Sequence, residues 1–336
     1  MQHESPRFLV IGCGSIGRRH IGNLMSLVGK CVLGFDIRRD RLEEASSQLG
    51  FEALHNLDDA WRYSVKAVLI TTPPSSHVSL ALQIAERRCP LFIEKPLSDR
   101  LDNRVATLMK VVKKKNLVTL VGCNMRFHPG IVKVRKLLEQ RAIGNIIAAR
   151  VEAGQYLPDW HPWENYRHTY SASRRLGGGI ILDAIHEIDY IRWMLGEIKS
   201  IVCFAGKLSR LEIETEDTAA ILLRFVNGAI GEVHLDYVQR TYSRTCQIIG
   251  EEGTVRWDYA TGKVRWYSTA TRKWKTFSNP PRWNPNQMYL DEMKHFLRCL
   301  SGRDRSTLDV FEASRVLEVA TAAKRSARTG KVVELA

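Results

Sequence analysis

One unit near the start of the chain constrains the fold more than any other. It is a short apolar run, a glycine-rich turn, a helical pattern and a second apolar run that ends in an acid. The first run is Phe8-Leu9-Val10-Ile11, the turn is Gly12-Cys13-Gly14-Ser15-Ile16-Gly17, and the second run, Cys31 to Phe35, ends at Asp36. An isolated G-x-G-x-x-G is weak evidence. Between a strand and a helix, with an acid about 20 residues further on, it predicts a βαβ unit that binds a dinucleotide.

Each position of the turn has a predicted role. Gly12 allows the tight turn, Gly14 lets backbone N–H groups approach a pyrophosphate, and Gly17 lets the helix pack on the strand. The helix begins around Ser15 and Ile16, and its N-terminus stabilises phosphate charge. These residues are therefore the predicted pyrophosphate site.

The acid after the second strand bears on the choice of cofactor. Asp36 would accept hydrogen bonds from the adenosine ribose hydroxyls, which favours NAD over NADP. Arg38 and Arg39 follow it closely, and a 2′-phosphate could bind them. The sequence therefore predicts NAD and leaves NADP open.

Strand and helix patterns go on alternating to about residue 124, which predicts a doubly wound parallel sheet with ligands at the carboxyl ends of its strands. Lys95 stands at such an end, after the strand Leu91 to Ile93 and before Pro96, with an X-Pro bond that could be cis. The alternative is a surface lysine in a loop. The further expected strands are 67–70 and 117–121, and the expected helices are 41–49, 78–88 and 101–115.

The pattern changes after Asn124, so we divide the chain into a nucleotide-binding domain, 1–124, and a second domain, 125–336. Repeated strand patterns, punctuated by turn residues such as Asn227-Gly228, predict an α+β domain with a large open, mostly antiparallel sheet. Such a sheet often leaves one face for a partner subunit. The expected strands are 146–151, 201–204, 218–225, 229–237, 246–249, 254–257 and 263–267, and the expected helices are 131–138, 287–300 and 310–326.

The stretch from Gln155 to Arg175 combines aromatic side chains with arginine and histidine. This content suits the wall of a binding site for a polar, possibly anionic, ligand such as a sugar. The alternative is a long surface loop. The candidate ligand-binding residues of this stretch are Tyr156, Trp163, Tyr166 and Arg167.

Three glycines, 177–179, precede a helical pattern that ends at Gly196. Asp183 and His186 are three residues apart, so they are expected on one face of an amphipathic helix. An ionisable pair on a helix that otherwise requires burial is a candidate proton-transfer site. The alternative is a buried histidine held by a carboxylate for packing.

Composition excludes several classes of protein. No apolar run is long enough to span a bilayer, and residues 1–6 lack the basic start of a signal peptide. The seven cysteines are scattered, which suits reduced thiols in the cytoplasm and argues against a metal site. The net charge is +14, from 50 basic and 36 acidic residues. Because this charge is spread along the chain, with its densest run at 110–115 expected on a solvated helix face, we favour anionic small ligands over nucleic acid.

Together these motifs resemble the Gfo/Idh/MocA family of NAD(P)-dependent oxidoreductases over nearly the whole chain. The resemblance implies a Rossmann domain followed by an α+β domain with an open sheet, often assembled as a homodimer or homotetramer. It also implies that Thr72, Pro73, His77, Glu94 and Lys95 help to hold the cofactor. The residues that carry it are the turn 12–17, Thr72-Pro73-Pro74-Ser75-Ser76-His77, Glu94-Lys95-Pro96, Asn124-Met125-Arg126-Phe127, and Gly177-Gly178-Gly179 with Asp183, His186 and Asp189.

In that family a lysine and a histidine flank the reacting carbon, which implies Lys95 and His186 here. Family members commonly place the aspartate four residues before the histidine, whereas Asp183 is three before His186. The expected reaction moves a hydride between nicotinamide and a hydroxyl carbon of a sugar, with Arg126 among the substrate contacts. We expect a nucleotide-sugar or sugar acid, as in surface-polysaccharide pathways. The alternatives are an inositol or free aldose, NAD-dependent glycoside hydrolysis, and a regulator that binds NAD(H) without turnover.

Overall fold

The computed structural model describes residues 7–160 and 162–335; residues 1–6, for which no signal peptide was predicted, and His161 of the aromatic stretch lie outside them. The chain forms two compact units. Unit 1 is Met1–Asn124 with Pro285–Ser314, and unit 2 is Met125–Asn284 with Arg315–Ala336. The division after residue 124 had assigned 285–314 to the second domain. The structure places this segment in unit 1, because its helix packs on a helix of the first sheet.

Unit 1 is built on a parallel sheet of six strands in the order β3-β2-β1-β4-β5-β6, as expected for a doubly wound fold. Every strand predicted for this half is present. The short β3 was not predicted, since two residues give no periodicity. The strands are β1 (Arg7–Ile11), β2 (Val32–Phe35), β3 (Glu52–Ala53), β4 (Val65–Ile70), β5 (Leu91–Glu94) and β6 (Thr119–Gly122).

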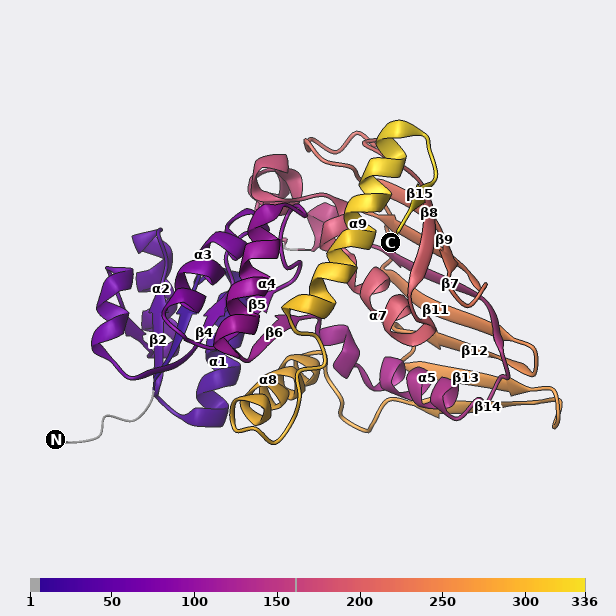
Figure 1. The fold of residues 1–336 in the computed structure, drawn as a ribbon, viewed down its shortest axis with the longest axis horizontal. Helices are drawn as coiled ribbons and strands as arrows, with labels where there is room; N and C mark the ends of the chain where they lie inside the picture. Colours follow the sequence, from indigo (N-terminus) through magenta and orange to yellow (C-terminus); the bar gives the residue numbers. More distant parts are fainter. Residues whose placement is uncertain (1–6, 161, 336) are drawn as a thin grey trace. The chain divides into compact units, whose positions relative to one another are not determined.

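Helices flank this sheet, and local sequence sets their ends (Figure 1). Pro74 is the first residue of α3, where the backbone N–H that proline lacks would have no partner within the helix. The Asp102 carboxylate caps α4 by accepting a hydrogen bond from the Arg104 N–H. Gly50 ends α2 in a left-handed conformation. The helices are α1 (Ser15–Val28), α2 (Arg39–Leu49), α3 (Pro74–Glu86), α4 (Asn103–Lys115) and α8 (Asn286–Leu300), with the 3₁₀ helix η1 at Leu57–Arg62.

Unit 2 is built on a nine-stranded mixed sheet in the order β14-β13-β12-β11-β7-β10-β9-β8-β15. Its pairs are antiparallel except β7 with β10, which is parallel. The prediction of a large, mostly antiparallel sheet is confirmed. The strands are β7 (Ile146–Gly154), β8 (Ile198–Gly206), β9 (Thr218–Phe225), β10 (Ile230–Asp236), β11 (Ser243–Gly250), β12 (Gly253–Asp258), β13 (Lys263–Ser268), β14 (Lys273–Ser278) and β15 (Val333–Glu334).

Two strands of this sheet escaped prediction for different reasons. β14 is exposed along almost its whole length, so it lacks the alternation of buried and exposed residues that marks a half-buried strand. β15 is two residues long and pairs only at Ile201 and Ser200 of β8. Both lie at the edges of the sheet, where few side chains are buried and the sequence therefore shows little alternation of apolar and polar residues.

Helices cover one face of this sheet, on which the alternate side chains of β9 are buried (Figure 1). The opposite face is open and carries large apolar side chains. Phe204 is 76% exposed, Leu222 53% and Ile230 50%. The covering helices of unit 2 are α5 (Pro129–Glu139), α6 (Ile180–Asp183), α7 (Ile185–Leu195) and α9 (Val310–Thr329).

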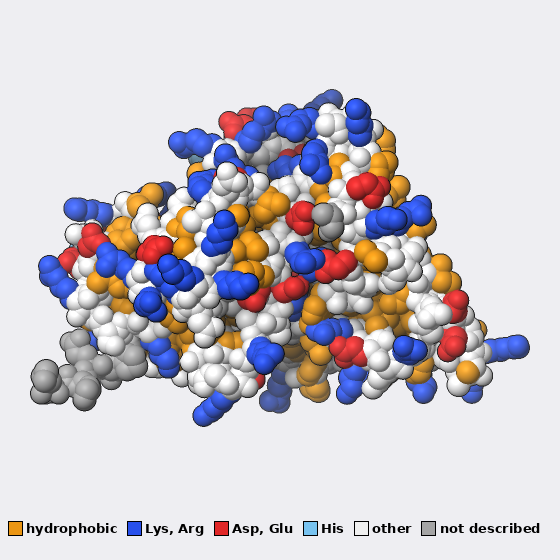
Figure 2. Space-filling view, viewed as in Figure 1, with side chains coloured by type: hydrophobic (Ala, Val, Ile, Leu, Met, Phe, Trp, Pro, Cys, Tyr) orange, Lys and Arg blue, Asp and Glu red, His pale blue; other side chains and the backbone are white. Residues whose placement is uncertain are grey.

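The surface charge is dispersed. Figure 2 shows lysine and arginine side chains scattered over the visible face, with acidic side chains among them. Lys110, Lys113 and Lys114 are exposed on α4, so the basic run is the solvated helix face that was expected. Among the described residues, no helix is long and apolar enough to cross a membrane.

Candidate active site

The glycine-rich turn joins β1 to α1 and permits contacts that no side chain would allow. Gly12 has φ +101°, and a Cβ there would lie 2.8 Å from the carbonyl carbon of Thr71. A Cβ on Gly17 would lie 1.9 Å from the Gly12 carbonyl oxygen. At Gly14 the nearest atom to such a Cβ is 3.8 Å away, so this position is open. Gly12 and Gly17 therefore shape the turn, whereas Gly14 and the exposed Ser15 leave its backbone accessible to a phosphate.

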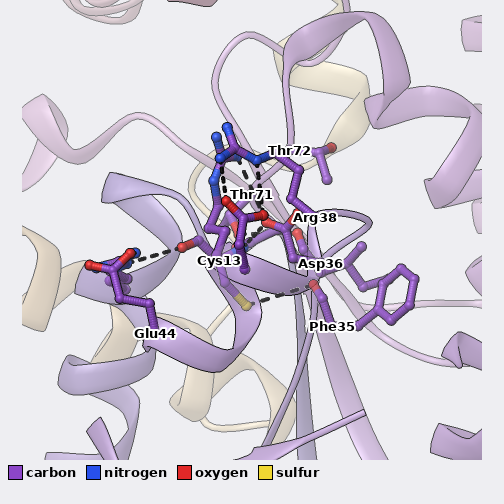
Figure 3. A network of polar contacts seen from close by, with 12 residues as sticks. Cys13, Phe35, Asp36, Arg38, Glu44, Thr71 and Thr72 are labelled. Atoms are coloured by element: carbon purple, nitrogen blue, oxygen red, sulfur yellow. Dashed lines mark hydrogen bonds and ion pairs between the residues drawn. The ribbon is translucent and has the colours of Figure 1, made fainter. Parts of the chain in front are cut away.

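Asp36, at the end of β2, is tied to this turn (Figure 3). Its Oδ2 accepts a hydrogen bond from the Cys13 N–H at 2.8 Å, and its Oδ1 accepts one from the Arg38 N–H at 2.8 Å. Carboxylate oxygens have further lone pairs, so the ribose-binding prediction stays chemically feasible. The carboxylate also fixes the turn, a role that the sequence did not reveal.

The arginines near Asp36 are arranged differently from the expectation. Arg38 forms an ion pair with Asp40 at 2.5 Å and is directed to solvent. Arg41, which was not predicted, lies 3.8 Å from Asp36 and is the side chain nearest to Gly14. Arg41 is therefore better placed than Arg38 to contact the adenosine end of a dinucleotide.

The end of β4 lies directly against the glycine turn. The Thr71 hydroxyl donates to the carbonyl of Gly12 at 2.7 Å, which holds the turn in place (Figure 3). Thr72 and Pro73 follow, and the Thr72 hydroxyl hydrogen-bonds the Ser76 hydroxyl at 2.7 Å. Thr72 and Pro73 thus lie where predicted, at the carboxyl end of a strand adjacent to β1, and Thr71 is an addition.

Lys95 follows β5, and the Lys95–Pro96 peptide bond is cis. Glu94 is buried and uses both carboxylate oxygens: Oε1 is 2.5 Å from the His20 Nε2, and Oε2 accepts from the Lys95 N–H at 3.0 Å. The side chain of His20 is fully buried, beneath Phe92 and Tyr289. The buried Glu94 carboxylate therefore fixes the backbone of Lys95 at the end of β5.

His77 has no exposed surface. Its Nδ1 lies 2.8 Å from the Pro96 carbonyl and its Nε2 lies 2.7 Å from the Thr72 carbonyl. Burial lowers the pKa of this imidazole from its ordinary value. In this conformation His77 can serve a cofactor only by holding Thr72 and the Lys95–Pro96 turn together.

The helix expected across Asp183 and His186 is interrupted, which corrects the prediction that they share one helix face. α6 ends at Asp183, Ala184 leaves the helical conformation with φ −93° and ψ 33°, and α7 begins at Ile185. The segment is also buried on all sides and not amphipathic, since every residue from Ile180 to Arg192 is buried. His186 is 8% exposed and Asp183 is 3% exposed.

The Asp183 carboxylate is bound by three hydroxyl groups from two other segments, the 3₁₀ turn Tyr170–Ala172 and the residue after β10. It accepts hydrogen bonds from the Tyr170 hydroxyl, from the Ser171 hydroxyl at 2.5 Å and from the Tyr237 hydroxyl at 2.7 Å. Burial and the charge of Asp183 raise the pKa of Tyr237 well above its ordinary value, so this tyrosine remains a donor. Donors from outside the helix thus fix the carboxylate two positions before α7, and no spacing rule could have identified them.

Arg126 was predicted to bind substrate. It is 4% exposed and forms a bidentate ion pair with the buried Asp189, at 2.8 and 2.6 Å. The guanidinium also lies 4.8 Å from the centroid of the Trp193 ring. The structure thus gives Arg126 a packing function in unit 2, and its contact with substrate stays a prediction.

The aromatic stretch forms a series of short 3₁₀ turns, so its residues have different surroundings. Trp163 is 77% exposed. Arg167 pairs with Glu212 at 2.7 Å, and the Tyr166 hydroxyl accepts from the Glu212 N–H at 3.3 Å. The Tyr156 ring lies beneath the Arg240 guanidinium at 3.7 Å. Of these candidates, Tyr156 adjoins the network around Asp183 most directly, because Leu157 donates its N–H to the Tyr237 carbonyl at 2.9 Å.

Family models identify the class of protein. Residues 6–123 match the model described as the oxidoreductase family with an NAD-binding Rossmann fold, and residues 131–256 match the model of the GFO/IDH/MocA C-terminal domain. The chain is therefore an oxidoreductase with an NAD-binding Rossmann domain. It belongs to the Gfo/Idh/MocA family, as its motifs had indicated.

Similar proteins span the whole chain. The scyllo-inositol 2-dehydrogenase (NAD(+)) of Bacillus subtilis is 28% identical, over 100% of this chain and 97% of its own length. The myo-inositol 2-dehydrogenase of Thermotoga maritima is 27% identical, over 98% of both chains. The structure of levoglucosan dehydrogenase with NADH matches with a TM-score of 0.88 at 21% identity, over 98% of this chain and 99% of that one.

Proposed function

We propose that this protein is an NAD-dependent dehydrogenase that oxidises a hydroxyl group of a sugar or sugar derivative. The observation that carries the proposal is the buried Asp183, held by three hydroxyl donors immediately before the helix of His186. A protein that only binds NAD needs neither this network nor the lysine that Glu94 holds after β5. The inositol and levoglucosan dehydrogenases to which the chain is similar act on compounds of this class.

NAD, when bound, supplies the hydride acceptor, and the residues at the carboxyl ends of β1, β2 and β4 fit it. The open backbone at Gly14 and the N-terminus of α1 would receive the pyrophosphate, and Asp36 with Arg41 would adjoin the adenosine. Because Asp36 is an acid at the ribose position, we propose NAD over NADP.

His186 acts as the general base, since the unperturbed pKa of an imidazole, about 6.5, suits proton removal near neutral pH. The Lys95 ammonium polarises the reacting oxygen and stabilises the negative charge that develops on it. Asp183 orients the imidazole, and the three hydroxyls hold this carboxylate in place.

For the substrate we propose an anionic sugar, either a sugar acid or a nucleotide-sugar. The net charge of +14 favours anionic ligands. A neutral polyol such as an inositol is the second candidate, and the similarity to inositol dehydrogenases supports it.

The test measures the absorbance of NADH after the purified protein is mixed with NAD and with each member of a panel of sugar acids, nucleotide-sugars, free sugars and inositols. We expect turnover with one class, and a loss of about 10²- to 10⁴-fold in kcat for His186→Ala and for Lys95→Met, because each removes a group that acts only on the reacting atoms. NAD titration by tryptophan fluorescence should stay unchanged in His186→Ala. Near-full turnover by His186→Ala would refute the assignment, and release of an aglycone without NADH would indicate glycoside hydrolysis instead.

We further propose a cytoplasmic homodimer or homotetramer, joined through the open face of the unit 2 sheet. On this face Phe204, Leu222, Ile230 and Ile249 are exposed, and large apolar side chains exposed on one open sheet face support an interaction site there. Light scattering should show an oligomer for the wild type and a shift toward monomer for Leu222→Glu. An unchanged mass would place the interface elsewhere.

A further inference from the structure

Two loops of unit 2 leave the sheet at the same end. β7 and β10 are parallel neighbours, and their last residues, Gly154 and Asp236, are paired in register. The loops that follow are also hydrogen-bonded to each other, because the Gln155 N–H donates to the Asp236 carbonyl at 3.2 Å. Side chains from both loops therefore gather at the carboxyl ends of two adjacent parallel strands, which is a common location for ligands in parallel sheets.

The first loop supplies Tyr156 and the second supplies Arg240. The guanidinium carbon of Arg240 lies 3.7 Å from the centroid of the Tyr156 ring, which is a close cation–π contact. Arg240 is exposed and Tyr156 is partly buried, so the ring supports one face of the guanidinium and leaves its N–H edge open to solvent. The stacking restricts the side chain before any ligand arrives.

Arg240 lacks an acidic partner, as does the exposed Arg272 among the described residues, whereas several other arginines of unit 2 have one. Arg126 pairs with Asp189, Arg244 with Glu187, and Arg167 with Glu212. Among residues 7–160 and 162–335, Arg240 has no carboxylate within ion-pair distance. Its five N–H donors are thus available for an incoming anion.

The backbone beneath Arg240 is held rigidly by Asp236. The Oδ1 of this buried carboxylate accepts from the N–H groups of Val238 at 2.8 Å and Gln239 at 2.7 Å, and its Oδ2 accepts from the Gln239 amide at 2.8 Å. In the same turn, the hydroxyl of Tyr237 donates to Asp183. The segment that presents Arg240 is therefore the one that also orients the carboxylate before His186.

We propose that Arg240, stacked on Tyr156, binds the anionic group of the substrate, a carboxylate or a phosphate attached to the sugar. A planar guanidinium binds either group through two parallel N–H···O bonds. Arg240 is in this way the residue that selects an anionic sugar over its neutral counterpart. This inference rests on the proposed function, because it assigns the selectivity of that site.

The test is a binding measurement that needs no turnover. The NAD-loaded full-length protein is titrated calorimetrically with matched pairs of probes: glucuronate with glucose, galacturonate with galactose, and UDP-glucuronate with UDP-glucose. We expect the wild type to bind the acidic member of at least one pair more tightly. Arg240→Gln should remove about 10- to 100-fold of affinity for that acid and leave the neutral member unaffected, since the lost bonds are charge-assisted.

Three further variants separate a specific contact from a general effect. Arg272→Gln removes the same charge from the exposed turn between β13 and β14, and it should bind like the wild type. Arg240→Lys keeps the charge without the planar fork, so we expect it to recover part of the affinity. Tyr156→Leu removes the ring beneath the guanidinium and should weaken binding of the acid less than Arg240→Gln does.

Equal losses of affinity for the acid in Arg240→Gln and Arg272→Gln would overturn the inference. It would also be overturned if the wild type bound both members of every pair with equal affinity, or bound neither member of any pair. A wild type that reduces NAD with neutral sugars alone would also overturn it while the dehydrogenase assignment stands. Selective, Arg240-dependent binding of an acid without any NADH formation would instead support the inference and contradict the proposed function.

Discussion

The hydroxyl of Tyr237 donates a hydrogen bond to the carboxylate of Asp183 at 2.7 Å, across 54 positions of sequence. Tyr237 follows β10 and Asp183 ends α6, so the bond links the central sheet of unit 2 to the segment that precedes His186. Both side chains are buried. The position of this carboxylate is therefore set by the tertiary fold and not by the helix on which it lies.

Tyr237→Phe should lower kcat by about 10-fold and leave the affinity for NAD unchanged, because a hydrogen bond to a charged acceptor contributes about 1.5–3 kcal/mol. Tyr190→Phe is the matched control. Tyr190 is equally buried, and its hydroxyl has no hydrogen-bond partner among the described residues. Steady-state kinetics of both variants provide the test, and equal behaviour would mean that the network around Asp183 does not contribute to turnover.

Gly14→Ala should weaken NAD binding, whereas Gly17→Ala should lower the stability of the fold. Gly14 has φ −70° and space for a methyl group, so its variant should fold normally and bind NAD at least about 10-fold more weakly, because the methyl group would lie against the pyrophosphate. At Gly17 the methyl group would collide with the Gly12 carbonyl, so we expect a loss of about 1–3 kcal/mol or more of stability. Thermal unfolding and NAD titration separate the two effects. Normal NAD binding by Gly14→Ala would show that the pyrophosphate does not approach this turn.

Asp189→Asn should destabilise unit 2 strongly, because it leaves the buried Arg126 guanidinium without its counter-charge. Breaking a buried pair in this way costs about 3–5 kcal/mol. Glu139→Gln is the control, since it breaks an exposed pair with Arg135 on α5 and should cost about 1 kcal/mol or less. Urea unfolding monitored by fluorescence gives both values. If both variants lost a similarly small free energy of unfolding, Arg126 and Asp189 would be solvated and Arg126 would be accessible to a ligand.

His234 should titrate above the ordinary pKa of histidine, because its hydrogen bond to Asp236 favours the imidazolium and raises its pKa. The pair stabilises the fold at pH values below the unfolded pKa of about 6.5, and that contribution is lost as the pH rises through the raised value. NMR titration of the ring protons is the measurement. Asp236→Asn should return the pKa toward its ordinary value, and a wild-type pKa at or below that value would contradict the assignment.

Local sequence was informative wherever a residue acts through its own backbone or its nearest neighbours. The glycine turn, Asp36 after β2 and Lys95 after β5 were identified because the carboxyl ends of parallel strands meet at one edge of a sheet. The helix through Asp183 and His186 was predicted as continuous and is broken at Ala184, and hydroxyl donors from other segments hold Asp183. Periodicity reports burial along one element and carries no information about such donors.

By itself, the sequence determined the Rossmann unit, the mostly antiparallel second sheet, the family and the candidate cofactor-binding turn, because each follows from short-range patterns of apolar residues, glycines and strand-end acids. Only the tertiary structure decided that 285–314 joins unit 1, that Arg126 is buried against Asp189, and that Arg240 lies on Tyr156. These contacts join residues far apart in the chain. They depend on which strands become neighbours, and that is decided when the whole sheet assembles and buries its apolar face.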